Sequence, residues 1–200
     1  PGAFPVLDAD GGAAGGGGTP GGGVGRFGGA MAAGVLGNLP GLPGALAGSG
    51  IQVPARVLDA GASTGGFTQV VLEAGAQQVY AVDVGHGQLV EALRTDPRVV
   101  VRERLNLRDL TLADLDGQRV GLVVADVSFI SLTLILEPLL ATLEPGGHAL
   151  LLVKPQFEVG RAGLDDRGVV RDPRLRARAL DAVVAAAADL GWTPRWQAES

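Results

Sequence analysis

Each of five short apolar runs in this sequence is ended or followed by a polar residue that can bind a ligand or move a proton. These residues are Asp59, Asp83, Asn106, Asp126 and Lys154. If the runs are parallel strands, their carboxyl ends share one edge of the sheet, where such sheets bind ligands. Any one residue could instead cap a turn or face solvent, but five in succession predict a site.

The first two apolar runs enclose a glycine-rich turn, GASTGG, at residues 61–66. Glycine lets a ligand approach the backbone closely, and the helix predicted at residues 67–74 offers free N–H groups at its start. The second run, residues 79–82, is followed by Asp83, whose carboxylate can accept both hydroxyls of a ribose. The pattern favours a nucleoside ligand, and the alternative is a tight turn without one.

The glycines are spaced G-x-x-x-G-G, which differs from the G-x-G-x-x-G of dinucleotide-binding turns. Asp59 adds a negative charge beside the turn, which opposes a pyrophosphate and favours a cation. The sulfonium and ammonium groups of S-adenosylmethionine suit such a site. A nicotinamide oxidoreductase is therefore the less favoured alternative.

Strand-like and helix-like segments alternate along residues 51–200. Further strands are predicted at residues 99–101, Val120–Ala125, 149–153 and 192–197, and helices at residues 88–94, 132–143 and 173–190. This alternation, with apolar strand cores, predicts an α/β fold: an open, mostly parallel, Rossmann-like sheet with helices on both faces.

Residues 1–50 differ from the rest, because they hold 19 of the 33 glycines. Such a low-complexity segment buries too little apolar surface to fold alone, so most of it is predicted to be disordered. A poor helix within residues 31–46 would be interrupted by Pro40 and Pro43. Two parts are expected: this segment, and one domain over residues 51–200.

Composition excludes several classes of site. The sequence has no cysteine and two histidines, so neither a disulfide nor a thiolate or histidine metal centre is expected. It contains no apolar run long enough to span a membrane and no signal peptide, which predicts a cytoplasmic protein without a membrane partner. The net charge of −5 argues against wholesale coating of nucleic acid.

Several longer blocks carry a family resemblance. They lie at residues 59–68 (DAGASTGGFT), 80–89 (YAVDVGHGQL), 96–99, 103–106, 126–132 (DVSFISL), 154–158 (KPQFE) and 168–172. In this order they resemble the TlyA (haemolysin A) family of S-adenosylmethionine-dependent ribosomal RNA 2′-O-ribose methyltransferases, relatives of the FtsJ group. The resemblance covers residues 55–195 and implies a class I methyltransferase fold.

The resemblance implies S-adenosylmethionine as cofactor and no metal. The glycine turn would hold its methionine part, Asp83 its ribose, and Asn106 would lie near its adenine. The implied cofactor-binding residues are Asp59, Gly61, Ser63, Thr64, Gly65, Gly66, Phe67, Asp83, Val84, Asn106 and Asp126.

Asp126 and Lys154 match the second and third members of the family's Lys-Asp-Lys-Glu catalytic set. A ribose hydroxyl must lose its proton as the methyl group transfers. A neutral lysine amine can take that proton, whereas arginine cannot, because it stays protonated in proteins. Asp126 would orient the lysine and the incoming hydroxyl.

The sequence departs from the family pattern in three ways. The glycine-rich segment stands where the family has an S4-type RNA-binding domain. The first catalytic lysine is expected within residues 25–33, where Ala30 or Met31 occupies its place. The Gly-Asn-x-Glu segment with the catalytic glutamate is not found, and the strand beside the fifth strand is expected to be missing, so the domain is predicted to be C-terminally incomplete. A cofactor-binding pseudoenzyme or an inactive fragment is therefore the alternative function.

Residues 154–178 carry seven basic and four acidic side chains, a net charge of +3. This stretch is predicted to contact the phosphates of ribosomal RNA or a ribosomal subunit, and the alternative is a solvated helix face. Phe129, Phe157 and Trp192 are the nearby aromatic residues for stacking bases, or belong to the core. The sequence indicates no oligomeric state.

Overall fold

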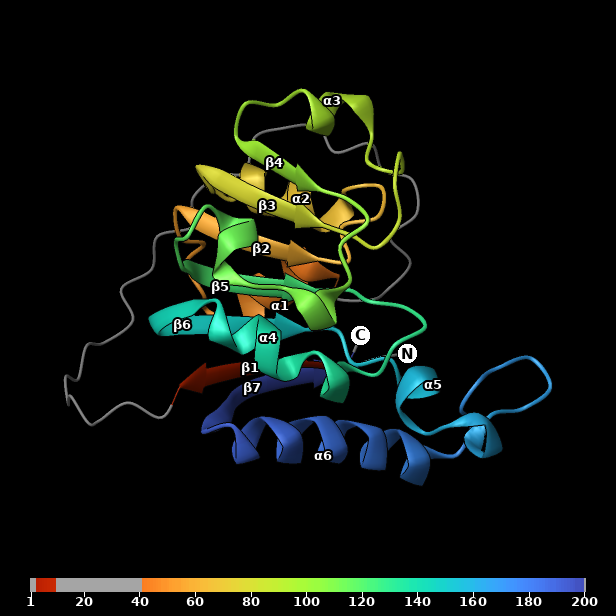
Figure 1. Cartoon of the computed structure of the whole chain (residues 1–200). Coiled ribbons are helices and arrows are strands. Elements are labelled where there is room, and N and C mark those ends of the chain that lie inside the picture. The colour runs from red at the N-terminus through yellow and green to blue at the C-terminus, as the bar shows by residue number, and fades with distance from the viewer. Residues whose placement is uncertain (1–2, 10–40, 200) are drawn as a thin grey trace, which may run out of the picture.

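The computed structural model describes residues 3–9 and 41–199. Its strands form one sheet of seven in the order β4-β3-β2-β5-β6-β1-β7 (Figure 1). The strands are β1 (Ala3–Ala9), β2 (Arg56–Ala60), β3 (Gln78–Val82), β4 (Val99–Arg102), β5 (Val120–Ala125), β6 (Leu143–Leu151) and β7 (Trp192–Glu199). Strands β2 to β6 run parallel, and β1 runs antiparallel to both of its neighbours. The predicted open, mostly parallel α/β sheet is confirmed.

Helices cover both faces of the sheet. They are α1 (Leu42–Ser49), α2 (Gly66–Glu73), α3 (Glu91–Arg94), α4 (Leu136–Ala141), α5 (Pro155–Glu158) and α6 (Pro173–Asp189). Short 3-10 turns lie at η1 (Leu107–Asp109), η2 (Leu112–Leu115), η3 (Leu132–Leu134) and η4 (Arg161–Gly163). Asp172 caps α6 by accepting from the Arg174 N–H at 2.8 Å, and Pro173 opens that helix, as the sequence predicts.

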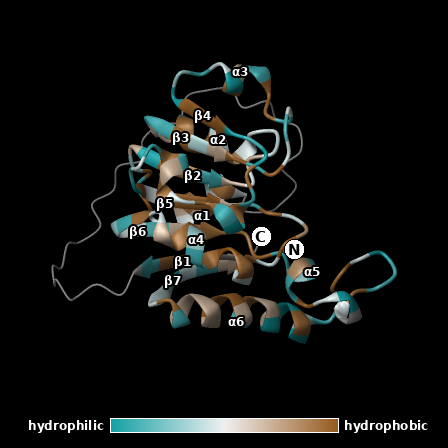
Figure 2. Ribbon diagram, viewed as in Figure 1, coloured by the Kyte–Doolittle hydropathy of each residue, from teal (hydrophilic) through white to brown (hydrophobic). Residues whose placement is uncertain are grey.

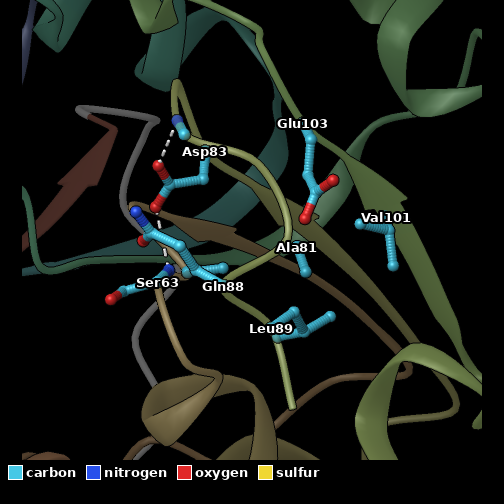
Figure 3. Close-up of a pocket in the computed structure, with 9 residues that line it drawn as sticks. Ser63, Ala81, Asp83, Gln88, Leu89, Val101 and Glu103 are labelled. Carbon is cyan, nitrogen blue, oxygen red and sulfur yellow. Dashed lines mark hydrogen bonds between the residues drawn. The ribbon is translucent and has the colours of Figure 1, made fainter. Parts of the chain in front are cut away.

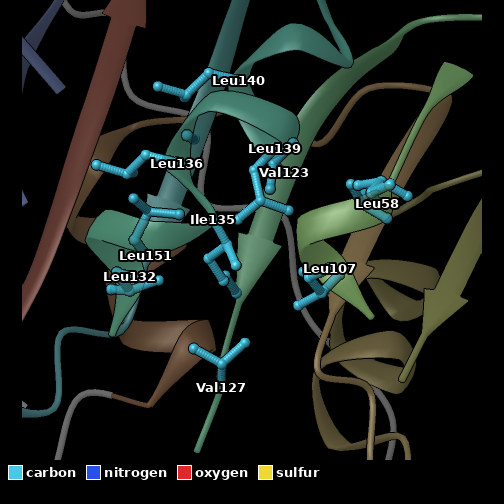
Figure 4. Close-up of a cluster of buried hydrophobic side chains, with 14 of the residues drawn as sticks. Leu58, Leu107, Val123, Val127, Leu132, Ile135, Leu136, Leu139, Leu140 and Leu151 are labelled. Carbon is cyan, nitrogen blue, oxygen red and sulfur yellow. The ribbon is translucent and has the colours of Figure 1, made fainter. Parts of the chain in front are cut away.

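Two apolar clusters divide along the pleat of the strands. Leu58 of β2 and Val123 of β5 face a cluster with α4 and α6, which Figure 4 shows around Leu136 and Leu139. The preceding and following residues, including Val57, face the other cluster with α1, α2 and α3. Because successive side chains of a strand point to opposite faces, a strand covered on both faces must be apolar throughout. Every residue of β5 is buried, and Figure 2 shows apolar residues along the central strands.

The N-terminal strand corrects two predictions. Most of residues 1–50 was expected to be disordered, and the place beside the last parallel strand to be empty, yet β1 lies there, between β6 and β7. Val6 and Leu7 are buried, and the 8% exposed Asp8 contacts His148 Nδ1 at 2.5 Å and Arg195 Nη1 at 2.8 Å. Because residues 1–50 are rich in glycine overall, their composition did not reveal this short apolar strand, which pairs with both β6 and β7.

Helix α1 is the second ordered part of the segment that was expected to be disordered. Pro43 does not interrupt it, because proline is tolerated in the first turn, where its missing N–H has no helical partner. The predicted disorder of residues 10–40, and the part of the poor helix before residue 41, lie outside the described residues. The division into two parts at residue 50 stays a prediction.

Several other boundaries differ from the sequence prediction. The segment 132–143 divides into η3 and α4, the helix expected at residues 88–94 begins only at Glu91, and α5 and η4 lie after residue 154 in a stretch where no helix was predicted. Strand β6 begins at Leu143, well before the strand predicted at residues 149–153, and includes the Pro-Gly-Gly sequence at residues 145–147. The pairing of β5 with β6 shifts register between Val120 and Leu122, and this irregularity accommodates the extra residues of β6.

Candidate active site

Two glycines of the turn after β2 are required by space as well as by backbone conformation. Gly61 has φ +84°, and a Cβ there would lie 2.7 Å from the Asp126 carbonyl oxygen. Gly65 has φ +101°, and a Cβ there would lie 2.2 Å from Leu93 Cδ1. At Gly66 a Cβ would meet no described atom within 4 Å, so this glycine faces open space. The turn is therefore packed against its neighbours on one side and accessible on the other.

Asp83 is held in place by the backbone. Its Oδ2 accepts from the Ser63 N–H at 2.8 Å, as Figure 3 shows, and its Oδ1 accepts from the Gly85 N–H at 2.7 Å. Each oxygen keeps a second acceptor position for a ligand hydroxyl. The pocket in front of it is lined by Ala62, Ser63, Ala81, Asp83, Gly85, Gln88, Leu89, Val101 and Glu103.

Asp59 is fully buried at the end of β2. Its Oδ2 accepts from the Thr68 hydroxyl at 2.6 Å, whereas its Oδ1 has no hydrogen-bond partner among the described residues. The pKa of Asp59 is raised to about 7, mainly by burial and in part by the charges of Asp126 and Asp83, although the hydrogen bonds from Thr68 lower it. Asp126 and Asp83 thus lie close enough to Asp59 to disfavour its negative charge, which fits a ligand that carries positive charge.

The remaining residues predicted to bind a cofactor fall into two groups. Thr64 and Phe67 support the turn: the Thr64 carbonyl accepts from the Val90 N–H at 3.2 Å, and Phe67 packs on the apolar cluster beneath α2. Val84 is 71% exposed beside Asp83, so its apolar surface remains available. Asn106, in contrast, caps η1 by accepting from the Arg108 N–H at 3.1 Å and does not line the pocket.

Glu103 lines the pocket, whereas Asn106, which was predicted to lie near the adenine, does not; that role of Asn106 stays a prediction. Glu103 Oε1 accepts from the Gly87 N–H at 2.8 Å and from Arg94 Nη2 at 2.6 Å, and Arg94 lowers the pKa of Glu103. Sequence reasoning missed Glu103, Gln88 and Leu89. A signal existed for Glu103, because it directly follows the strand β4, whereas Asn106 lies four residues beyond the strand.

The structure brings Asp126 and Lys154 together at the ends of β5 and β6. Lys154 Nζ lies 2.5 Å from Asp126 Oδ1 and donates to Ser128 Oγ at 3.0 Å. The contact with Asp126 is an ion pair without hydrogen-bond geometry. The backbone of Asp126 abuts Gly61, so this pair adjoins the glycine turn. The Lys154 side chain is only 22% exposed, which places a charged group in a mostly enclosed position.

The loop after Asp126 presents an aromatic ring to solvent. Phe129 is 93% exposed and has φ +65°, a conformation that non-glycine residues seldom adopt. Its ring contacts the ring of Phe157, with centroids 5.3 Å apart and planes tilted by 53°. Both residues come from the segments that carry Asp126 and Lys154. An exposed aromatic surface therefore lies beside the lysine and aspartate.

A parallel sheet of this order, with a glycine turn after its first parallel strand and a carboxylate after the second, defines a Rossmann-like class I methyltransferase fold. The structure of a fibrillarin/Nop5p complex shares this fold, with a TM-score of 0.50 at 16% identity over 66% of this chain and 62% of that one. The chain belongs to the FtsJ-like methyltransferase family, whose model matches residues 42–195. Membership of this family contradicts the alternative prediction of a nicotinamide oxidoreductase.

The predicted resemblance to TlyA and haemolysin A is also confirmed. The chain is 55% identical over 152 residues to the 16S/23S rRNA (cytidine-2′-O)-methyltransferase TlyA of Mycobacterium tuberculosis, and 42% identical over 144 residues to hemolysin A of Brachyspira hyodysenteriae. These matches cover 76% and 72% of this chain. A proposed hemolysin from Lactococcus lactis superposes with a TM-score of 0.72 at 45% identity, covering 75% of this chain and 72% of that one.

The chain spans 56% of the length of the M. tuberculosis protein and 60% of that of the B. hyodysenteriae protein. Within residues 3–9 and 41–199, none of the helices has the length and apolar character needed to cross a membrane. In the same part of the chain, no three histidine or acidic side chains gather in a way that could hold a metal ion.

Proposed function

We propose that this chain is an S-adenosylmethionine-dependent methyltransferase domain that modifies a ribose 2′-hydroxyl of ribosomal RNA. The observation that carries the proposal is the ion pair between Lys154 and Asp126 beside the glycine turn. A group that can take a proton therefore lies beside a turn and pocket that suit a nucleoside. The similarity to the M. tuberculosis rRNA methyltransferase supports the same substrate class.

The residues present fit the cofactor. The unpartnered oxygen of Asp59 and the carboxylates near it suit a ligand with ammonium and sulfonium charges, and Asp83 offers two oxygens to a ribose. Gly66 leaves open space for close approach. When bound, S-adenosylmethionine supplies the methyl group on an electrophilic sulfonium.

The protein's own residues prepare the ribose hydroxyl. Lys154 in its neutral form accepts the hydroxyl proton at Nζ, and Asp126 and Ser128 fix the position of that nitrogen. Holding the hydroxyl oxygen in line with the methyl group raises the rate of transfer, because the reacting atoms are already oriented. The enclosed position of Lys154 keeps competing water away from the amine.

Two surface features suit RNA. Arg161, Arg167, Arg174 and Arg178 are exposed in the stretch that follows Lys154, where they can contact phosphates. The exposed ring of Phe129 offers a surface on which an unpaired base can stack. These features support an RNA partner, either free ribosomal RNA or an assembled subunit; an RNA substrate of this kind would place the protein in the cytoplasm.

Calorimetry with S-adenosylmethionine tests the cofactor, and the variant Asp83→Ala is its control. We expect heat of binding for the wild type and at least tenfold weaker binding, by about 1.4 kcal/mol or more, for the variant. Transfer of labelled methyl groups to ribosomal RNA tests the substrate, with Lys154→Met as the inactive control. No binding by the wild type, or equal binding by the variant, would contradict the proposal.

A pseudoenzyme is the second candidate, because the sequence has a single lysine where the family's catalytic set has two. Such a protein would bind the cofactor without methyl transfer. Transfer to either naked RNA or assembled subunits that Lys154→Met abolishes would exclude it.

A further inference from the structure

A second link joins the two segments that carry Asp126 and Lys154. Glu158, at the end of α5, accepts through Oε2 from the Ser131 hydroxyl at 2.5 Å and through Oε1 from the Leu132 N–H at 2.9 Å. Ser131 and Leu132 lie where the loop that begins at Asp126 enters η3, whereas Glu158 ends the helix α5, which Lys154 directly precedes. The two segments are therefore tied at both ends, once by the ion pair and once by Glu158.

We propose that Glu158 is a positioning residue: by holding the loop after β5 against the helix after β6, it keeps Lys154 Nζ against Asp126 and Ser128. The effect of Glu158 on catalysis rests on the proposed function. Both carboxylate oxygens of Glu158 accept hydrogen bonds from this loop, so the role assigned to it is to act through Lys154.

The surroundings of Glu158 make the link rigid. Leu132 is buried in the core, and Pro155, the first residue of α5, is buried too. Each end of the link is thus attached to a packed part of the molecule. Hydrogen bonds to a charged carboxylate are also stronger than those between neutral groups.

The backbone between the two ties shows that the loop needs restraint. Phe129 has φ +65° and an almost fully exposed side chain, so packing of its own ring contributes little to this conformation. Such a backbone persists only where its surroundings impose it. The ion pair on one side and Glu158 on the other impose it here.

Lys154 provides a direct probe, because it is the sole lysine of the sequence. Protein labelled with ¹³C at lysine Cε gives one lysine side-chain signal by NMR. We expect Glu158→Ala to shift or broaden this signal. Glu158→Gln should leave it close to the wild type, since its amide oxygen can accept from Leu132 and its NH₂ can donate to Ser131. Glu137→Ala, on the exposed side of α4, is the matched control.

The same variants are compared in single-turnover methyl transfer at saturating cofactor. We expect Glu158→Ala to slow the transfer roughly tenfold to a hundredfold, as small misplacements of reacting groups do. The Kd for S-adenosylmethionine should stay within about twofold, because the pocket lies at other strands. Ser131→Ala, which removes one of the two bonds, should give a smaller loss than Glu158→Ala.

The outcomes separate this inference from the proposed function. An unchanged lysine signal in Glu158→Ala overturns the positioning role, as does an equal change in Glu137→Ala. A shifted signal with an unchanged transfer rate overturns its part in catalysis. If the wild type transfers no methyl group but the signal still moves in Glu158→Ala and recovers in Glu158→Gln, the positioning role stands and the proposed function fails.

Discussion

The two halves of the site are held together by different means. The pocket at the ends of β2, β3 and β4 is built from backbone: N–H groups of Ser63, Gly85 and Gly87 fix Asp83 and Glu103. The half at the ends of β5 and β6 depends mostly on contacts between side chains, with Lys154 on Asp126 and Ser128, and Glu158 on Ser131, although the Leu132 N–H also donates to Glu158. Substitutions should therefore affect the first half through the fold of a turn and the second through individual groups.

The largest effect is expected at Lys154. Lys154→Arg keeps a positive charge beside Asp126 but removes the proton acceptor, because arginine stays protonated. We expect methyl transfer to fall roughly 10²- to 10⁴-fold, with cofactor affinity unchanged. Quench-flow transfer and calorimetry measure the two quantities. A variant that retains more than half of the wild-type rate would show that Lys154 acts only as a charge.

The pocket half should respond to pH through Asp59. Its pKa in the folded protein is raised from 3.8 to about 7, so the folded state binds more protons than the unfolded state between these values. The cost of burying the ionised carboxylate is absent below pH 3.8, grows through this window and is complete above pH 7, where it reaches about 4 kcal/mol.

Asp59→Asn should therefore stabilise the protein at pH 8 by up to about 4 kcal/mol and by progressively less toward pH 4. Urea unfolding across this range measures the difference. Saturating S-adenosylmethionine should stabilise the wild type more than the variant, since the ligand's charge offsets that of the carboxylate. Equal stabilities at pH 8 would refute the electrostatic account of Asp59.

Two adjacent glycines give a matched test of the backbone-built turn. Gly65→Ala places a Cβ 2.2 Å from Leu93 Cδ1 at φ +101°, and we expect a loss of about 2 kcal/mol or more in the free energy of unfolding. Gly66→Ala meets open space at a helix start and should leave stability unchanged or slightly raised, while weakening cofactor binding. Thermal unfolding and calorimetry distinguish them, and similar destabilisation of both would contradict the packing argument.

The smallest expected effects distinguish Glu103, which lines the pocket, from Asn106, which caps η1. Glu103→Gln should weaken cofactor binding by about 1 kcal/mol, because it perturbs a residue that lines the pocket. Asn106→Ala should leave cofactor affinity unchanged and lower the free energy of unfolding by about 1 kcal/mol through loss of a cap. The reverse pattern would support the role near the adenine that the sequence predicts for Asn106.

Prediction from sequence succeeded where local pattern encodes the structure. The central strands are continuous apolar runs, the turn is marked by glycines, and Asp83 directly follows its strand. It failed for β1, since a seven-residue strand is not distinguished by composition from the glycine-rich chain around it. It also did not single out Glu103, which directly follows β4 and lines the pocket, and it did not anticipate that Asn106, four residues beyond that strand, caps η1.

The sequence by itself determined the parallel sheet, the glycine turn and the order of polar residues along its edge, because periodicity, turn residues and strand ends are local properties. Only the tertiary structure decided that β1 lies between β6 and β7, that Glu103 lines the pocket, and that Glu158 links the loop of Asp126 to the helix of Lys154. These features depend on which strands lie side by side, and contacts between residues far apart in the chain carry no local pattern.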